Sequence, residues 1–226
     1  MNLFAQAWDY LTTVGNWSGP TGIGMRIGQH LWYSFLAVAG SAILAVPLGM
    51  LIGHTRRGSA AIVGFANAMR ALPTLGLLTF FVLLMGLGLI PPLLALLTVG
   101  IPPLLAGAYA GVANVDATVV DASRAMGMTE RQILLGVELP NALPVLLTGL
   151  RAATLQVVAT ATIAAYVNLG GLGRYIFDGI GLYKYDRVLV GAILVAALAL
   201  ALDGLLALAV RLSAPGVRQS LSKSNH

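Results

Sequence analysis

The sequence predicts an all-α protein that crosses a membrane about five times. Of its 226 residues, 58% are hydrophobic and only 9% are charged, and the mean hydropathy is +0.87. A soluble domain has roughly 45–50% apolar and about 25% charged residues, so these proportions exclude a soluble enzyme. Apolar stretches of about 20 residues, the length that crosses a bilayer as a helix, recur along the chain. Five such stretches leave no room for an additional folded domain.

The remaining features of the composition narrow the function further. The chain has no cysteine, which excludes a disulfide framework and thiolate metal sites. Its net charge of +5 comes from few charged groups. Cytoplasmic loops that follow the positive-inside rule explain this charge better than nucleic-acid binding does. His30, His54 and His226 are too scattered to form a metal site. We therefore expect no metal and no nucleic acid, and contact with membrane lipid.

Residues 1–27 are predicted to lie outside the membrane or in its interface. Phe4, Trp8 and Leu11 recur at spacings of i, i+4 and i+7, which indicates one apolar face of a short helix. Such a helix lies in the headgroup layer of a bilayer. We expect it to end near residues 17–20.

Residues 28–212 are predicted to form one membrane domain, followed by a tail at 213–226. The five spans cover about residues 30–53, 62–89, 92–112, 144–167 and 188–212. Pro73 interrupts the second span, so we expect its first turns to be exposed to water or packed in protein. Gly107 and Gly111 in the third span have the small-xxx-small spacing that lets another helix approach closely.

The distribution of Lys and Arg predicts the orientation. One side of the membrane receives Arg56, Arg57, Arg124, Arg131, Arg211, Arg218 and Lys223. The other side receives Arg26, Arg174, Lys184 and Arg187. Because the side with more cations is cytoplasmic, we expect the N-terminus outside and the C-terminus inside.

The polar stretch between the third and fourth spans, residues 113–143, has the signals of a helix-turn-helix on the membrane surface. Asp116 can cap a first helix, and Gly127 ends it. Thr129 and Gln132 form a capping box for a second helix, which we expect to end before Pro140. The loop has more apolar residues than a solvated loop needs, and we expect it to dock on something. These residues are Val119, Val120, Ala122, Met126, Ile133, Leu134 and Val137.

The same stretch resembles the signature loop of binding-protein-dependent ABC importer permeases, EAA-xxx-G-x9-I-x-LP. The matching string is Asp121-Ala122-Ser123, then Gly127, then Val137, and Leu139-Pro140. Three departures are conservative: Asp for Glu, Ser for the second Ala, and Val for Ile. Several other segments are similar to permeases of the osmoprotectant uptake group. They are His30-Leu31-Trp32, Pro47-Leu48-Gly49, Arg70-Ala71-Leu72-Pro73-Thr74, Leu169-Gly170-Gly171-Leu172-Gly173 and Asp178-Gly179.

This resemblance implies the type I importer fold and a division of labour among subunits. The loop would be a coupling helix that enters a groove of a separate ATPase subunit, with Gly127 as its sharp turn. The coupling residues carried over are Asp121, Ala122, Ser123, Arg124, Met126, Gly127, Glu130, Arg131, Leu139 and Pro140. The implied partners are ABC ATPase subunits, a second permease subunit that is identical or related, and an extracytoplasmic solute-binding protein. The implied cargo is a compatible solute such as glycine betaine, choline, carnitine or proline.

ATP and Mg²⁺ would belong to the partner ATPase, so we expect no cofactor in this chain. Neither Lys184 nor Lys223 follows the glycines of a GxxxxGK[ST] motif. The glycine cluster from Leu169 to Gly173 follows a membrane span, not a strand. It therefore indicates a tight outer re-entry turn and not a nucleotide site.

Polar groups in or near the spans are candidates for the transport pathway, with helix-to-helix hydrogen bonding as the alternative. The pathway candidates are Asn67, Arg70, Pro73, Thr160, Thr162, Asn168 and Asp203. Asp203 is predicted to be a buried acid. Arg70, Arg151 and Asp203 also allow a different function, an autonomous ion- or proton-coupled carrier, although structural roles are favoured.

Two expectations concern the outer face. If the resemblance holds, the loop before the last span receives the binding protein through charged contacts at Arg174, Asp178, Lys184, Asp186 and Arg187. Aromatic residues also gather on this side, where an interfacial belt is favoured over a cage for a quaternary ammonium ion. They are Trp17, Trp32, Tyr33, Tyr166, Tyr175, Tyr183 and Tyr185.

Overall fold

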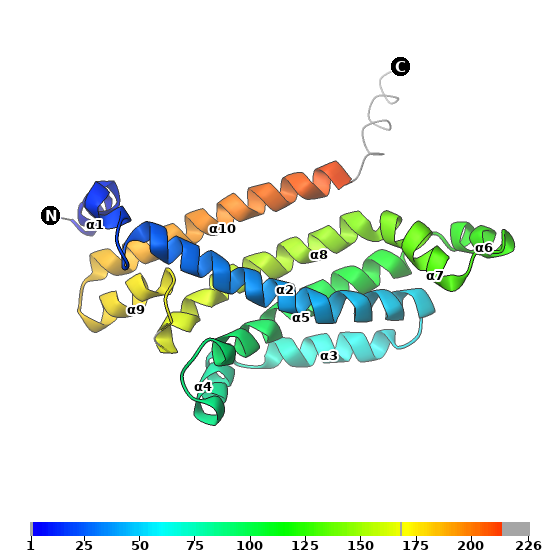
Figure 1. Ribbon diagram of the computed structural model, residues 1–226, viewed down its shortest axis with the longest axis horizontal. Helices are drawn as coiled ribbons and strands as arrows, with labels where there is room; N and C mark the ends of the chain where they lie inside the picture. Colours follow the sequence, from blue (N-terminus) through cyan, green and yellow to red (C-terminus); the bar gives the residue numbers. More distant parts are fainter. Residues whose placement is uncertain (1, 168, 214–226) are drawn as a thin grey trace, which may run out of the picture.

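The computed structural model describes residues 2–167 and 169–213 and shows a helical bundle in this part of the chain (Figure 1). The α-helices are α1 (Leu3–Thr12), α2 (Ile23–Thr55), α3 (Ser59–Ala71), α4 (Thr74–Met85), α5 (Ile90–Ala113), α6 (Ala117–Ala125), α7 (Glu130–Ile133), α8 (Leu139–Thr160), α9 (Gly173–Gly181) and α10 (Tyr185–Ser213). Two 3-10 turns cover Val14–Trp17 and Ala161–Val167, and a π-helical turn covers Leu134–Glu138.

Four helical segments of the described residues are long and apolar enough to cross a membrane, and a bent helix pair would make a fifth span. Helices α2, α5 and α10 are each long and apolar enough to cross a bilayer, as is the continuous helical run Glu130–Val167. The pair α3 and α4, which meet at an angle of 80°, has the composition of a broken span or of a re-entrant loop. This break confirms the predicted interruption, because Leu72 takes the extended conformation that a following proline imposes.

Three predicted boundaries differ from the ends of the helices in the structure. Helix α2 begins at Ile23, not near His30, because interface aromatics mark the edge of the membrane and nothing after Gly22 stops the helix there. The second loop helix does not end before Pro140, and the fourth span does not begin at Pro144. Instead, the π-helical turn joins α7 to α8, and Pro140 lies in the first turn of α8, where a missing N–H does little harm.

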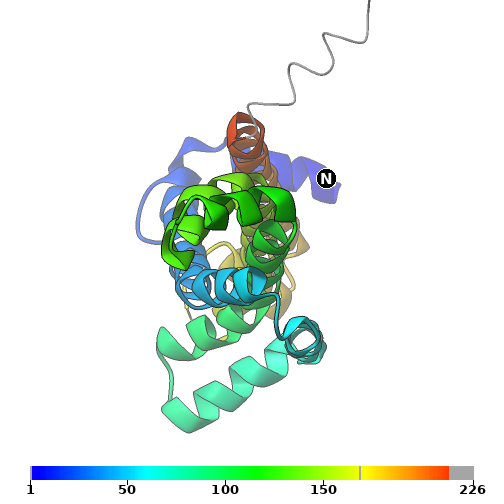
Figure 2. The same ribbon diagram turned by 90° about the vertical axis from the view of Figure 1, so that its right-hand side faces the viewer.

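Helix α5 lies at the centre of the bundle, with α2 and α8 packed along it (Figures 1 and 2). Small residues permit this close packing. A Cβ on Gly49 would lie 2.8 Å from the Leu105 carbonyl oxygen, and one on Gly107 would lie 2.8 Å from the Gly149 Cα. Gly111 likewise lies against Ala142 of α8. The predicted close approach of another helix to Gly107 and Gly111 is therefore confirmed.

The end of the bundle opposite the loop between α5 and α8, which is predicted to be the outer end, carries α1, the 3-10 turn that follows it, and α9 (Figure 1). The predicted amphipathic helix is present and ends at Thr12. Its Ala7 is buried in a cluster with Val190 and Leu194 of α10, whereas Phe4 and Trp8 are each 69% exposed. One face of α1 thus packs on the last span, and the opposite face is free to enter the headgroup layer.

Candidate functional site

The loop between α5 and α8 folds as the capping signals predict. Asp116 Oδ1 accepts a hydrogen bond of 2.8 Å from the Thr118 amide, which also lowers the pKa of the Asp116 carboxyl. Gly127 has φ +84° between α6 and α7. Thr129 and Gln132 form the reciprocal capping box at the start of α7. The helix-turn-helix lies at one end of the bundle, facing the viewer in Figure 2.

The apolar residues of this loop divide into two groups. Val120 and Ile133 are buried in a cluster with Val115, so they hold the loop together and are not available for docking. Met126 is 74% exposed and Val119 is 45% exposed. These two residues belong to the apolar surface that a partner can cover, together with Leu135, which is 48% exposed.

The residues carried over for ATPase coupling are likewise divided. The exposed residues are Asp121, Ala122, Arg124, Met126, Gly127, Glu130, Arg131 and Pro140. Ser123 is 4% exposed and donates to the Val119 carbonyl. Leu139 packs partly into the cluster around Met50 and Val112. These last two residues support the loop from inside.

An ion-pair network joins this loop to the end of α2. His54 Nδ1 lies 2.6 Å from Glu138 Oε2, and its Nε2 lies 3.1 Å from Glu130 Oε2. Arg124 bonds both oxygens of Glu130 at 2.9 and 3.0 Å, which raises the pKa of the guanidinium. Arg124 also contacts Asp121 at 3.2 Å. Nothing in the residue spacing links His54 to Glu138, 84 residues away, so this contact could not be predicted from the sequence.

The pathway candidates do not form one cluster with Asp203. Asn67, Arg70 and Pro73 are exposed along α3 and its end, and Thr160 and Thr162 are partly buried near the outer end of α8. Asn168 lies outside the described residues, as do the tail residues Arg218, Lys223 and His226.

Asp203 is less buried than predicted, and it forms the helix-to-helix contact that its favoured structural role implies. Its side chain is 28% exposed, and both carboxylate oxygens accept hydrogen bonds from Arg151 of α8, at 2.6 and 2.7 Å. The charge of Asp203 can therefore be kept within a span because a bidentate guanidinium neutralises it.

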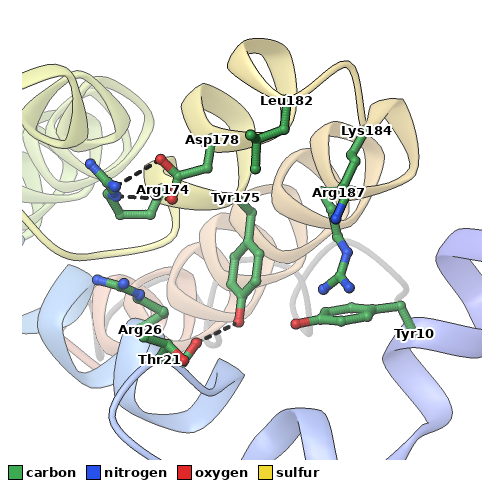
Figure 3. Close-up of a pocket in the computed structure, with 10 residues that line it drawn as sticks. Tyr10, Thr21, Arg26, Arg174, Tyr175, Asp178, Leu182, Lys184 and Arg187 are labelled. Carbon is green, nitrogen blue, oxygen red and sulfur yellow. Dashed lines mark hydrogen bonds and ion pairs between the residues drawn. The ribbon is translucent and has the colours of Figure 1, made fainter.

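A cleft of about 230 Å³ lies where α1, α2, α9 and α10 meet (Figure 3), and we call it the outer cleft because it lies at the end predicted to be outside. Its lining comprises Tyr10, Thr21, Arg26, Arg174, Tyr175, Asp178, Gly179, Leu182, Lys184 and Arg187. Four of these residues are cationic and one is acidic. Arg26 was predicted to lie on this side of the membrane, but neither it nor Tyr10 was predicted to join the charged surface, because both belong to segments far from the loop before α10.

Contacts within the cleft hold several of its side chains in place. The Arg187 guanidinium lies 3.5 Å from the centre of the Tyr10 ring. The Arg174 guanidinium pairs with Asp178 at 2.8 Å, and Tyr175 donates a hydrogen bond to the Thr21 carbonyl. Burial raises the pKa of Tyr175. Asp186, predicted to belong to the same surface, lies outside the lining and contacts Arg187 at 3.4 Å.

The glycine cluster and the aromatic residues were the other features predicted for this end of the bundle. The glycine cluster forms a turn in which the Gly171 amide, at φ +89°, donates to Gln29 Oε1 of α2 at 2.9 Å. The aromatic residues do not gather into one cage. Tyr175 lies in the cleft, whereas Tyr166 contacts Phe177 and Trp32 stacks on Phe35.

A polytopic bundle with a structured two-helix loop at one end and a charged cleft at the other defines a transport permease. The chain belongs to the family of binding-protein-dependent transport system inner membrane components, whose model matches residues 45–215. It is thus a multi-pass membrane subunit of an ABC transport system and not itself an enzyme. Membership in this family implies an ATPase and a binding protein as partners, with ATP hydrolysis on the ATPase.

Individual relatives cover most of the chain. The glycine betaine/carnitine/choline transport system permease protein OpuCB of Bacillus subtilis is 35% identical over 198 residues, which are 88% of this chain and 91% of that protein. The osmoprotectant import permease protein OsmY of Salmonella typhimurium is 35% identical over 81% of this chain and 79% of its own length. Among solved structures, an inward-facing MetNI methionine ABC transporter matches with a TM-score of 0.73 at 21% identity, over 83% of this chain and 94% of that chain. This last likeness concerns the fold.

Proposed function

We propose that this chain forms the membrane pathway of an ATP-driven importer for a compatible solute of the glycine betaine, choline and carnitine class. The observation that carries the proposal is the loop of residues 121–140, which combines the family signature with an exposed, capped helix-turn-helix. The names of the relatives support the solute class. Proline is a further candidate solute, and the transport experiment described below includes it.

The loop is proposed to couple the chain to the ATPase. Val119 and Met126 present the exposed apolar surface, and charged side chains surround it. A short helix with caps at both ends transmits a displacement that an irregular loop would absorb. Movement of the ATPase subunits can therefore reach the spans through α6 and α7.

The outer cleft is proposed to receive the solute-binding protein. Its lining has an excess of positive charge, and Tyr183 and Tyr185 beside it are 80% and 56% exposed. Tyrosine and arginine are enriched in protein interfaces, and charge attraction speeds docking. This role requires the cleft to lie outside and α6 to lie in the cytoplasm, with residues 213–226 as a cytoplasmic tail.

The pathway is proposed to lie between this chain and a second permease, identical or related. Asn67, Arg70 and Pro73 are exposed on the broken span and are candidates to face it, with Thr160 and Thr162 nearer the outer end. Asp203 contributes through its pair with Arg151 and not as a proton-binding group. Because the chain is one subunit of an ABC system, an autonomous carrier built on Arg70, Arg151 and Asp203 is not favoured.

The test is purification of the tagged chain from its native membrane in mild detergent, followed by reconstitution into liposomes. We expect an ATPase and a solute-binding protein to accompany it. We also expect uptake of labelled glycine betaine, choline or carnitine that requires ATP inside the liposome. Uptake by the chain alone, without nucleotide, would overturn the proposed function. ATP-driven uptake of proline but not of the three amines would overturn the solute class only.

A further inference from the structure

We propose that His54 is a positioning residue that ties the coupling loop to α2, so that a displacement of α6 is passed to the bundle. This inference rests on the proposed function of the loop. His54 lies outside the family signature, in the last turn of α2. Its side chain is only 11% exposed, and both of its ring nitrogens contact carboxylates of the loop region.

The two carboxylates come from opposite ends of the segment that joins the loop to α8. Glu130 opens α7 and is 58% exposed, whereas Glu138 ends the π-helical turn and is 3% exposed. A carboxylate only accepts hydrogen bonds, and an imidazole ring with protons on both nitrogens can donate to both at once. His54 therefore clamps this segment at two points, 2.6 Å from Glu138 and 3.1 Å from Glu130.

The contacts continue from His54 to the start of the signature. Glu130 is held by Arg124 of α6, and Arg124 also contacts Asp121. A second contact comes from the same end of α2, where Arg56 donates to the Val115 carbonyl at 3.3 Å. An unbroken series of polar contacts thus joins α2 to the helix that is proposed to enter the ATPase groove.

Polar side chains carry this connection because the space between α2 and α6 is not filled by apolar packing. A cavity of about 240 Å³ lies there, lined by His54, Thr55, Arg56, Ala117, Val120, Asp121, Arg124 and Glu138. On its other side, α2 is packed tightly on α5, since Gly53 lies against the Tyr109 carbonyl and Val112. Because α2 is packed tightly on α5, a displacement of His54 moves both helices together.

The main test compares two substitutions of His54 in the complete reconstituted complex. The measured quantity is the number of solute molecules imported per ATP hydrolysed. We expect His54→Leu to lower this ratio about tenfold while ATP hydrolysis continues, a size within the range seen for mutations that alter coupling between sites. We expect His54→Gln to stay close to the wild-type ratio, because its amide can still donate to Glu138. Thr55→Val, in the same cavity but outside the network, is the matched control.

A second variant keeps the test decisive if His54→Leu does not assemble. Removing His54 leaves the Glu138 charge buried without a partner, which is destabilising. The double variant His54→Leu/Glu138→Leu removes both partners and should assemble, because replacing a buried pair by apolar groups is often close to neutral. We expect this double variant to remain uncoupled. A wild-type ratio in either assembled variant would overturn the role of His54.

A structural measurement tests the tether without relying on transport. Because the chain has no cysteine, spin labels can be placed at Ser59→Cys and Thr118→Cys alone. We expect the distribution of distances between them to broaden in His54→Leu and not in His54→Gln. An unchanged distribution would overturn the proposal. Absence of ATP-driven uptake in the wild-type complex would instead overturn the proposed function, so the two failures are distinguishable.

Discussion

At the scale of single residues, the turn between α6 and α7 depends on Gly127. Its φ of +84° is in the left-handed region, and a Cβ built there meets nothing within 4 Å. A substitution at this position therefore tests backbone conformation and not space. The left-handed conformation costs a residue with a side chain about 1–2 kcal/mol, and asparagine tolerates it better than β-branched residues do.

We predict that Gly127→Val inserts normally into the membrane but abolishes uptake, because the two loop helices can no longer fold back on each other. Gly127→Asn should retain most of the uptake. Immunoblots of membranes measure insertion, and transport of labelled solute measures function. Normal uptake by the valine variant would show that transport does not depend on the turn at Gly127.

The second prediction at this scale concerns the Arg151–Asp203 pair. We predict that Asp203→Asn keeps at least half of the uptake, since the amide oxygen can still accept a hydrogen bond from the guanidinium. Asp203→Leu should lower both uptake and thermal stability, because it leaves Arg151 without its partner in a span. The double variant Arg151→Leu/Asp203→Leu should recover stability relative to Asp203→Leu.

Uptake as a function of pH distinguishes this structural role from a carrier mechanism. A complete loss of transport in Asp203→Asn, together with loss of the pH dependence, would favour proton coupling through Asp203. Melting temperatures of the purified variants in detergent provide the stability readout.

At the scale of elements, the contact of α5 with α8 depends on glycines that face each other. A Cβ on Gly149 would lie 2.8 Å from the Pro103 carbonyl oxygen and 2.9 Å from the Gly107 Cα. Neither neighbour is the end of a flexible side chain, so the helices themselves must separate. Overpacking of this kind costs roughly 1–3 kcal/mol.

We predict that Gly149→Val lowers the melting temperature of the purified chain, whereas Gly204→Val does not. Gly204 lies inside α10, and a Cβ there meets nothing within 4 Å. Both changes place the same side chain in the middle of a helix, so the difference measures helix packing. Equal melting temperatures for the two variants would show that α5 and α8 do not depend on this close approach.

The elements show what the sequence could and could not predict. Hydropathy located the four long apolar helical segments and the bent pair α3 and α4, because burial in a bilayer needs long apolar stretches wherever they pack. Local chemistry located the break at Pro73 and the caps at Asp116 and Thr129. The early start of α2 was not predicted, since the ends of a helix and the edges of the membrane need not coincide. The π-helical turn before α8 has no comparable local signal.

The candidate sites were predictable only where one segment of the chain forms them. The coupling loop is such a segment, and its two helices are present as expected. The contact of His54 with Glu138 depends on how α2 packs beside the loop, and the presence of Tyr10 in the outer cleft depends on how α1 packs on α10. Residue spacing carries no information about such packing. Asp203 was expected to be buried because it lies within an apolar span, and its partner, Arg151, was not identified because it is 52 residues away.

At the scale of the whole molecule, the two ends of the bundle differ in a way that suits a transporter. One end bears the charged outer cleft, and the other bears the two-helix loop and the His54 network. Between them, α5 packs on α2 and α8 through glycines, with little free space. A change at one end can reach the other only as a movement of whole helices, because packed cores do not deform continuously.

This arrangement requires the loop to face the cytoplasm, where ATP is present, and we predict an outer N-terminus. The lack of native cysteine allows a direct measurement with Ser18→Cys and Ser59→Cys, two exposed serines at opposite ends of α2. In right-side-out membrane vesicles, a maleimide that cannot cross the membrane should label Ser18→Cys at once. It should label Ser59→Cys only after permeabilisation. The physical reason is that Arg56 and Arg57 precede Ser59, and cytoplasmic loops retain such charges. The opposite pattern would place α6 outside the cell, away from any ATPase, and would contradict coupling through the loop.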